Sequence, residues 1–183
     1  TVPLAAQLPA SVAGQPVPSL APMLQRVMPA VVSVNTKQRV RVRTPFDSDP
    51  VFRRMLGIPE ERINESLGSG VIVDAARGYV LTNHHVVNKG NSYQITLSDG
   101  TEYDVEKLAS DEFYLADESI DLAVLKIRNP GGIKFPAAVF GDSGLLSEGE
   151  WVIAIGNPYG LRHSVTSGIV SSVGRSDVGF AEI

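Results

Sequence analysis

The sequence predicts an all-β protein, in which one complete barrel of six strands is followed by the opening strands of a second barrel. Short runs rich in β-branched and aromatic residues follow one another closely along the chain. Turn residues separate these runs, including an Asp99-Gly100 pair typical of hairpins. A break at residues 129–136, which contains Asn129-Pro130-Gly131-Gly132, divides the two predicted barrels. Closely spaced strands joined by such turns favour a closed antiparallel barrel.

Composition and charge place the chain among ordinary globular proteins. It has 183 residues, of which 43% are hydrophobic and 20% charged, which is enough to form a packed core. The net charge of −4 is too small to indicate a nucleic-acid partner. The chain has no cysteine, which excludes a disulfide framework and a thiolate nucleophile. No apolar run approaches the roughly 20 residues that a membrane-spanning helix needs.

The first 18 residues are expected to form a flexible leader, because four prolines stand there among small apolar residues. The first barrel is then assigned to residues 19–130. Ser19 precedes apolar residues at helical spacing, which predicts a short capped helix that closes at Pro29. The chain therefore enters the barrel through a helix.

Strand-like runs in the first barrel are interrupted by one long loop. The loop is expected over residues 39–67, where basic residues, the two early prolines Pro45 and Pro50, and mixed charge indicate a surface segment. A helical turn is expected within it at residues 51–56. The predicted strands are residues 30–37, 71–74, 79–82, 93–97, 102–108 and 121–127.

The second barrel is expected to start within residues 131–183. Its predicted strands are residues 137–140, 151–155 and 164–173. Trp151 is expected in the core of that barrel, because a large aromatic side chain carries much apolar surface to bury.

A histidine pair follows one predicted strand, and a carboxylate precedes another. Residues 79–82 lead into Asn83-His84-His85, and Asp121 stands directly before the apolar run 122–127. Histidine has an unperturbed pKa of about 6.5, so it can act as a general base near neutral pH. A carboxylate that binds one ring nitrogen leaves the other free to face a serine nucleophile. The two segments therefore predict the base and the orienting carboxylate of a serine hydrolase.

Both members of this pair have competitors nearby. Residues at a strand end alternate in direction, so His84 and His85 are expected to point to opposite sides, which leaves the identity of the base open. The carboxylate is better defined, because only Asp121 is joined directly to an apolar strand. Its competitors are Asp111, Asp117 and Glu118.

These segments resemble the HtrA (Do/Deg) family of trypsin-like serine endoproteases, from about residue 19 to residue 176. The resemblance rests on Gly68-Ser69-Gly70, on the pattern Thr-Asn-x-His-Val at residues 82–86, and on the Asp-Leu-Ala that begins at Asp121. It implies a chymotrypsin-like double β-barrel, complete in its first half and partial in its second. It also implies that His85 is catalytic, that His84 fills a variable position, and that Asp121 orients His85. Ile120 and the extra residues 113–118 depart from the family pattern.

The nucleophile is missing from this pattern. Gly141-Asp142-Ser143-Gly144 resembles the serine turn of digestive trypsins, but it comes too early in the second barrel, and Leu145 replaces a glycine that the oxyanion-hole turn needs. Gly68-Ser69-Gly70 precedes both partners and is a weaker candidate still. The family's Gly-Asn-Ser-Gly-Gly motif is absent. The nucleophilic serine is therefore expected beyond Ile183, with an inactive form of the protease as the alternative.

The resemblance further implies endoproteolysis of misfolded or envelope proteins in the bacterial periplasm. Relatives of this family assemble as trimers and often carry PDZ domains after the protease, and the loop around Arg175 is a possible regulatory sensor, with a plain surface arginine as the alternative. Three histidines and no cysteine give poor metal-ligand spacing, and no cofactor is expected. The rival hypothesis is a non-enzymatic chaperone or holdase, or a pseudo-protease, that binds unfolded polypeptides.

Overall fold

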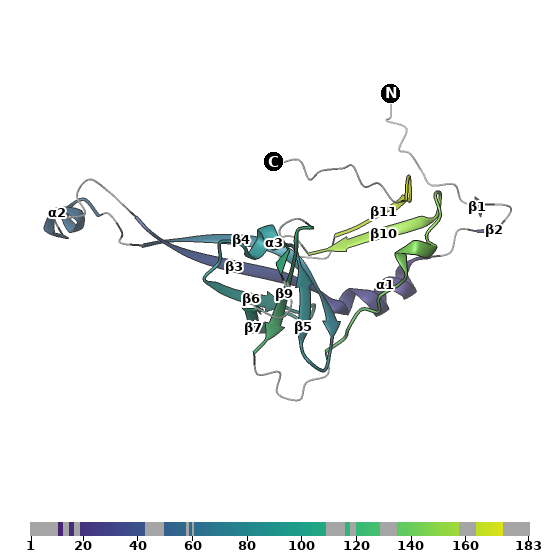
Figure 1. Ribbon diagram of the computed structural model, residues 1–183, viewed down its shortest axis with the longest axis horizontal. Coiled ribbons are helices and arrows are strands. Elements are labelled where there is room, and N and C mark those ends of the chain that lie inside the picture. Colours follow the sequence, from purple (N-terminus) through teal and green to yellow (C-terminus); the bar gives the residue numbers. More distant parts are fainter. Residues whose placement is uncertain are drawn as a thin grey trace, which may run out of the picture.

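The computed structural model describes residues 11–12, 15–16, 19–42, 50–57, 59, 61–108, 116–117, 120–128, 135–157 and 164–173. Strands dominate these residues, with a few short helices (Figure 1). None of the helices in the described residues is long and apolar enough to cross a membrane. The element order is β1 (Ser11–Val12), β2 (Gln15–Pro16), α1 (Ala21–Val27), η1 (Met28–Ala30), β3 (Val31–Arg41), α2 (Pro50–Met55), β4 (Glu61–Asp74), β5 (Tyr79–Thr82), α3 (His84–Val87), β6 (Ser92–Thr96), β7 (Glu102–Lys107), β8 (Ala116–Asp117), β9 (Leu122–Ile127), η2 (Ser143–Leu145), β10 (Trp151–Gly156) and β11 (Ser164–Ile169).

The first barrel is closed, which confirms the predicted all-β, chymotrypsin-like architecture. Six strands pair in the order β5-β4-β3-β6-β7-β9, and β9 pairs with β5 to complete the ring. Every neighbouring pair is antiparallel. Closure leaves these six strands without a free edge, and it sets β5 and β9, which are distant in sequence, side by side.

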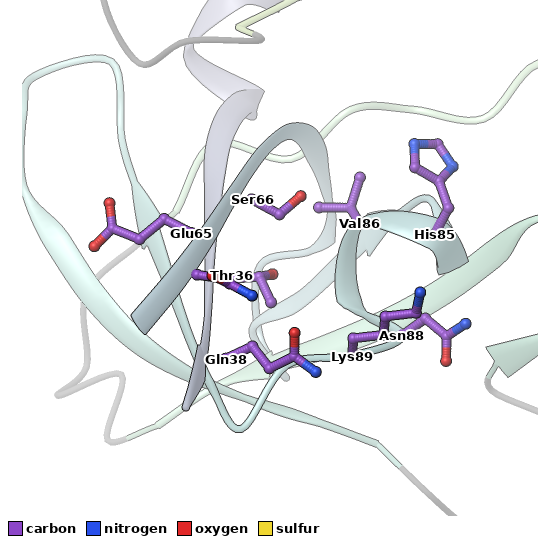
Figure 2. Close-up of a pocket in the computed structure, with 9 residues that line it drawn as sticks. Thr36, Gln38, Glu65, Ser66, His85, Val86, Asn88 and Lys89 are labelled. Carbon is purple, nitrogen blue, oxygen red and sulfur yellow. The ribbon is translucent and has the colours of Figure 1, made fainter. Parts of the chain in front are cut away.

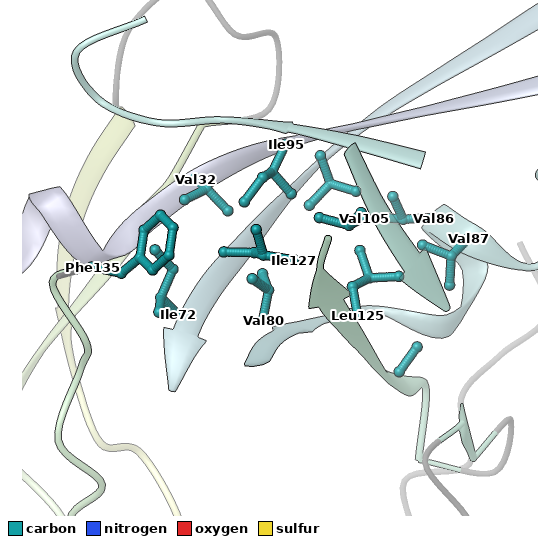
Figure 3. Close-up of a cluster of buried hydrophobic side chains, with 12 residues drawn as sticks. Val32, Ile72, Val80, Val86, Val87, Ile95, Val105, Leu125, Ile127 and Phe135 are labelled. Atoms are coloured by element: carbon teal, nitrogen blue, oxygen red, sulfur yellow. The ribbon is translucent and has the colours of Figure 1, made fainter. Parts of the chain in front are cut away.

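The interior of the barrel is filled by branched aliphatic side chains that alternate along the strands (Figure 3). One aromatic side chain joins them, because the Phe135 ring meets the Tyr103 ring edge to face with centroids 5.4 Å apart. The buried cluster consists of Val32, Val34, Ile72, Val80, Val86, Val87, Ile95, Val105, Ala123, Leu125, Ile127 and Phe135.

The prediction of a long loop over residues 39–67 is wrong at both ends of that range. β3 continues to Arg41 and β4 begins at Glu61, and the two strands pair without interruption from Val31↔Val71 to Arg41↔Glu61. The result is a two-stranded ribbon that projects from the barrel and has α2 at its far end (Figure 1). The sequence hides this pairing because residues 61–67 are exposed, so they lack the apolar alternation by which a half-buried strand is recognised. The helical turn expected at residues 51–56 corresponds to α2.

Near the N-terminus, the structure has short elements at the positions of the expected leader and the expected helix. The expected leader contains the two-residue strands β1 and β2, which pair with each other. The expected helix is α1, and the hydroxyl of Ser19 accepts a hydrogen bond from the backbone N–H of Ala21 at 3.2 Å.

Residues 135–173 hold a two-stranded antiparallel sheet of β10 and β11. The strand expected at residues 137–140 is wrong, because that segment is irregular and its backbone bonds the barrel once, from Ala138 N–H to the Ile72 carbonyl at 2.8 Å. Trp151 is exposed instead of buried in a core. The reason is that β10 and β11 pair only with each other among the described residues, so no further strand covers them.

Candidate active site

The site lies where β5 and β9 close the barrel. These strands pair from Tyr79↔Lys126 to Thr82↔Ala123. His85 follows β5 by three residues, and Asp121 directly precedes β9. Barrel closure therefore brings together two side chains that are 36 residues apart in the chain.

The two histidines lie on a short helix, which corrects the expectation that they alternate at a strand end. Asn83 is extended, with φ −79° and ψ 144°, and α3 begins immediately after it. Helical geometry turns successive side chains by about 100°, so His84 and His85 do not point in opposite directions. The helix lets both Val86 and Val87 enter the core, whereas a strand would send one of them outward.

His85 and Asp121 are in direct contact. The ring Nδ1 of His85 lies 2.7 Å from Asp121 Oδ2, and the backbone N–H of His85 donates to Oδ1 at 2.9 Å. The Asn83 amide donates to Oδ2 at 3.1 Å and to the Asp121 carbonyl at 3.2 Å. The backbone N–H of His84 donates to the same carbonyl at 3.1 Å. Three consecutive residues of the β5–α3 turn thus bind Asp121, and only His85 contributes its ring.

Asp121 adopts a left-handed backbone conformation, with φ 53°, and it is the one non-glycine residue with positive φ in the described part of the chain. Aspartate and asparagine tolerate this region better than other side-chain types. The turn lies between β8 and β9, whose last pair is Asp117↔Leu122. Asp117 belongs to β8, and the other two competing carboxylates, Asp111 and Glu118, lie outside the described residues.

The surroundings of Asp121 favour an ionised carboxylate. Burial raises the pKa of Asp121, but the hydrogen bonds from the His85 backbone and ring, the charge of His85 and the Asn83 amide together lower it below its ordinary value of 3.8. An ionised carboxylate only accepts hydrogen bonds, so the proton of a neutral His85 ring sits on Nδ1 and the Nε2 lone pair is free. The His85 side chain is 72% exposed, against 23% for Asp121. The free nitrogen is therefore open to a reactant.

Gly68-Ser69-Gly70 supports the site from β4. A Cβ at Gly68 would lie 2.6 Å from a methyl of Val86, so glycine is needed for α3 to approach the strand. The Ser69 carbonyl accepts a hydrogen bond from the Thr82 hydroxyl at 2.8 Å, and the Ser69 hydroxyl accepts one from Asn157 N–H at 2.7 Å. This serine is thus part of the packing between β5, β4 and the end of β10.

Ser143 does not join this cluster. Ser143 begins η2, where the Asp142 side chain accepts a hydrogen bond from Gly144 N–H at 2.9 Å and closes a turn. Arg175 lies outside the described residues. The main residue that sequence reasoning missed is Asn83. Asn83 is the asparagine of the Thr-Asn-x-His-Val pattern, but its hydrogen bonds to Asp121 can be recognised only in the structure.

Comparison with known proteins places this geometry in a family. The family described as trypsin-like peptidase domain matches residues 68–182. The periplasmic pH-dependent serine endoprotease DegQ of Escherichia coli K12 is 43% identical over 176 residues, which cover 93% of this chain and 36% of DegQ. The periplasmic serine endoprotease DegP of the same strain is 37% identical over 197 residues, which cover 94% of this chain and 40% of DegP.

Solved structures agree with these sequence relatives. The HtrA-type protease AlgW with decapeptide matches with a TM-score of 0.65 and 37% identity, over 88% of this chain and 48% of that chain. The same protease with tripeptide matches with a TM-score of 0.65 and 33% identity, over 89% of this chain and 43% of that chain. The chain spans well under half the length of the curated relatives DegQ and DegP. From the family match, these relatives and the barrel fold, the chain belongs to the HtrA family of trypsin-like peptidase domains.

Proposed function

We propose that this chain supplies the base and the orienting carboxylate of an HtrA-type serine endoprotease that degrades misfolded or envelope proteins. The contact between His85 Nδ1 and Asp121 Oδ2, at 2.7 Å, is the observation that carries the proposal. A carboxylate on Nδ1 is what a serine hydrolase needs to hold the imidazole in the tautomer that can accept a proton on Nε2.

In the proposed reaction, His85 Nε2 removes the proton from a serine hydroxyl as the oxygen attacks the scissile carbonyl. The ring becomes an imidazolium, which the ionised Asp121 stabilises. His85 then returns this proton to the leaving amine, and the C–N bond breaks to leave an acyl-enzyme. Water then repeats the cycle: His85 takes its proton as the oxygen attacks the ester carbonyl. The bond to the serine oxygen breaks, His85 returns the proton to the serine, and the carboxylic acid is released.

The proposal takes its nucleophile from a serine beyond residue 183, in a Gly-Asn-Ser-Gly-Gly turn. That motif does not occur in the 183 residues. Ser143 is not used, because Leu145 stands where the oxyanion-hole turn would need a glycine.

The partners and location in this proposal follow the relatives. The substrates are unfolded or misfolded proteins, the enzyme is a homo-oligomer built from trimers, and PDZ domains follow the protease. The location is the bacterial periplasm, because the relatives DegQ and DegP are named periplasmic endoproteases. Peptide binding is supported by the AlgW structures, which are described with a decapeptide and a tripeptide. The loop at Arg175 is proposed to sense such ligands.

A fluorophosphonate probe tests the proposal in the full-length protein, because it labels only a serine that is activated by a base. We expect labelling of the wild type, loss of labelling in His85→Ala, and retention in His84→Ala. The matched control removes the same ring one residue away on α3, where only the backbone N–H contacts Asp121.

The rival function gives a different result in the same assay. A full-length protein that carries Gly-Asn-Ser-Gly-Gly, resists the probe and still suppresses aggregation of an unfolded protein would be a holdase. Equal labelling of wild type and His85→Ala would also reject His85 as the base.

A further inference from the structure

The orientation of the His85 ring depends on one contact. Figure 2 shows the pocket between α3 and the β3–β4 ribbon, and the His85 ring is directed away from the ribbon. The His85 side chain is 72% exposed, and the one hydrogen bond that the described residues give its ring joins Nδ1 to Asp121 Oδ2 at 2.7 Å. Packing leaves such a ring free to turn, so the position of Asp121 Oδ2 decides where Nε2 points.

Asn83 is the N-cap residue of α3, but its side chain does not cap the helix. An asparagine at this position ordinarily accepts a hydrogen bond, through its side-chain oxygen, from a backbone N–H of the first turn. The backbone N–H of His85, which lies within that turn, donates instead to Asp121 Oδ1 at 2.9 Å. Asp121 thus takes over the capping bond, and the Asn83 amide is free for another contact.

The Asn83 amide binds two atoms of Asp121 at once. Its nitrogen donates to the carboxylate oxygen Oδ2 at 3.1 Å and to the backbone carbonyl of the same residue at 3.2 Å. An ionised carboxylate and a carbonyl only accept hydrogen bonds, so the NH₂ group of the amide, and not its oxygen, must face them. The two bonds tie the carboxylate to its own backbone, which is left-handed with φ 53°. A turn of the carboxylate would break the bond to Oδ2, so this oxygen is kept in place.

Oδ2 of Asp121 is the oxygen that the Asn83 amide and the His85 ring share. The remaining donor, the backbone N–H of His85, binds the other carboxylate oxygen. We propose that Asn83 is a positioning residue of the protease, whose amide holds Asp121 Oδ2 against His85 Nδ1 and so aims Nε2 at the nucleophile. Asn83 acts on the reaction only through Asp121 and His85. This inference rests on the proposed protease function.

Replacement of Asn83 by alanine tests this role in the full-length protein. Asn83→Ala removes the donor, and we expect kcat for peptide cleavage to fall about tenfold, the effect of one hydrogen bond to a charged group. KM should stay within about twofold, and the rate of fluorophosphonate labelling should fall by the same factor as kcat, because the amide serves the transition state and not substrate binding. Asn88→Ala is the matched control, because it removes an exposed amide at the C-cap of α3, and its kcat should stay within about twofold.

Asn83→Asp separates the hydrogen-bond donor from a merely structural role. Aspartate has nearly the same shape as asparagine and caps a helix equally well, but its ionised carboxylate cannot donate a hydrogen bond. It would also place a second negative charge beside Asp121 Oδ2. We therefore expect kcat to fall at least as far as in Asn83→Ala. Wild-type kcat in Asn83→Asp would assign Asn83 to helix capping and would overturn the proposal.

A double variant shows whether Asn83 acts through Asp121. If it does, adding Asn83→Ala to Asp121→Asn should lower kcat by less than about twofold. A further loss of about tenfold would show that Asn83 acts independently of Asp121 and would reject the role. If the wild type neither cleaves nor labels, the protease function fails and this inference fails with it. If His85→Ala abolishes labelling while Asn83→Ala labels at the wild-type rate, only the role of Asn83 is overturned.

Discussion

The first barrel and the β10–β11 hairpin use similar residues but bury them very differently. Ile95, on β6, is fully buried, whereas Ile169, on β11, is 57% exposed. The difference arises from pairing, because β6 has a partner on each side and belongs to a closed ring, while β10 and β11 pair only with each other among the described residues. A β-rich sequence thus gives a core only where the sheet closes on itself or meets a second layer.

The proposed active residues belong entirely to the well-packed region. His85 is carried by α3, whose Val86 and Val87 are anchored in the barrel core, and Asp121 stands directly before the barrel strand β9. Precise placement of a base needs a rigid support, which the closed barrel supplies. The comparison predicts that changes in the barrel affect both activity and stability, whereas equivalent changes in the hairpin region have small effects.

The largest effect is expected from Asp121→Asn. Asparagine tolerates the left-handed backbone at this position, so the fold should persist, but the amide no longer selects the correct tautomer of His85. We expect kcat for peptide cleavage by the full-length protein to fall about 10³- to 10⁴-fold. Asp142→Asn is the matched change in the second region, where the side chain caps a turn, and its kcat should stay within about twofold because asparagine caps as well as aspartate. Equal losses in the two variants would contradict the assignment of the site to the barrel.

The second effect concerns stability, and Ile95→Ala and Ile169→Ala compare the same truncation in the two regions. Removing the fully buried Ile95 side chain leaves a cavity and should lower the free energy of unfolding by about 2–5 kcal/mol. Removing the exposed Ile169 side chain should lower the free energy of unfolding by about 0.5 kcal/mol or less. Urea unfolding measures both variants. A large cost at Ile169 would show that the hairpin face is covered in the protein as tested, and the comparison would then no longer hold.

A smaller change in stability, opposite in sign between the two regions, is expected when a strand glycine in each is replaced by alanine. A Cβ at Gly70 would lie 2.9 Å from methyl carbons of both Val34 and Val80, so Gly70→Ala overpacks the core and should cost about 1–3 kcal/mol. A Cβ at Gly168 would meet nothing within 4 Å. Gly168→Ala should therefore stabilise by about 0.4–1 kcal/mol, through reduced freedom of the unfolded chain. Thermal unfolding of the two variants gives the signs directly, and a stabilising Gly70→Ala would show that the barrel core can relax.

Sequence reasoning performed best where burial imposes a pattern on the residues. β5 at Tyr79–Thr82 was predicted with its observed bounds, and β9 was predicted within one residue, because both alternate between the core and the outside. The start of β4 was missed because its first residues pair with β3 without burying a face. α3 was missed because four residues are too few to show a helical period.

The candidate site was only partly visible in the sequence for a related reason. His85 and Asp121 could be singled out from their neighbours by strand ends and family pattern. The role of Asn83 depends on the left-handed turn at Asp121, and that turn depends on how β8 meets β9. Such contacts follow from closure of the barrel, which residue patterns do not specify.

The smallest predicted effect is the pH dependence of the contribution that Asp121 makes to stability. The pKa of Asp121 is lower in the folded protein than its ordinary value of 3.8, because hydrogen bonds from His85 and Asn83 outweigh the effect of burial. In the acid range the unfolded chain therefore binds more protons at this residue, so its contribution is complete above about pH 4 and is lost as the pH falls through the folded pKa. Urea unfolding of wild type and Asp121→Asn should show a difference in stability that shrinks as the pH falls below about 4. A difference that stays constant or grows on acidification would mean that the three donors around Asp121 do not favour its ionised form.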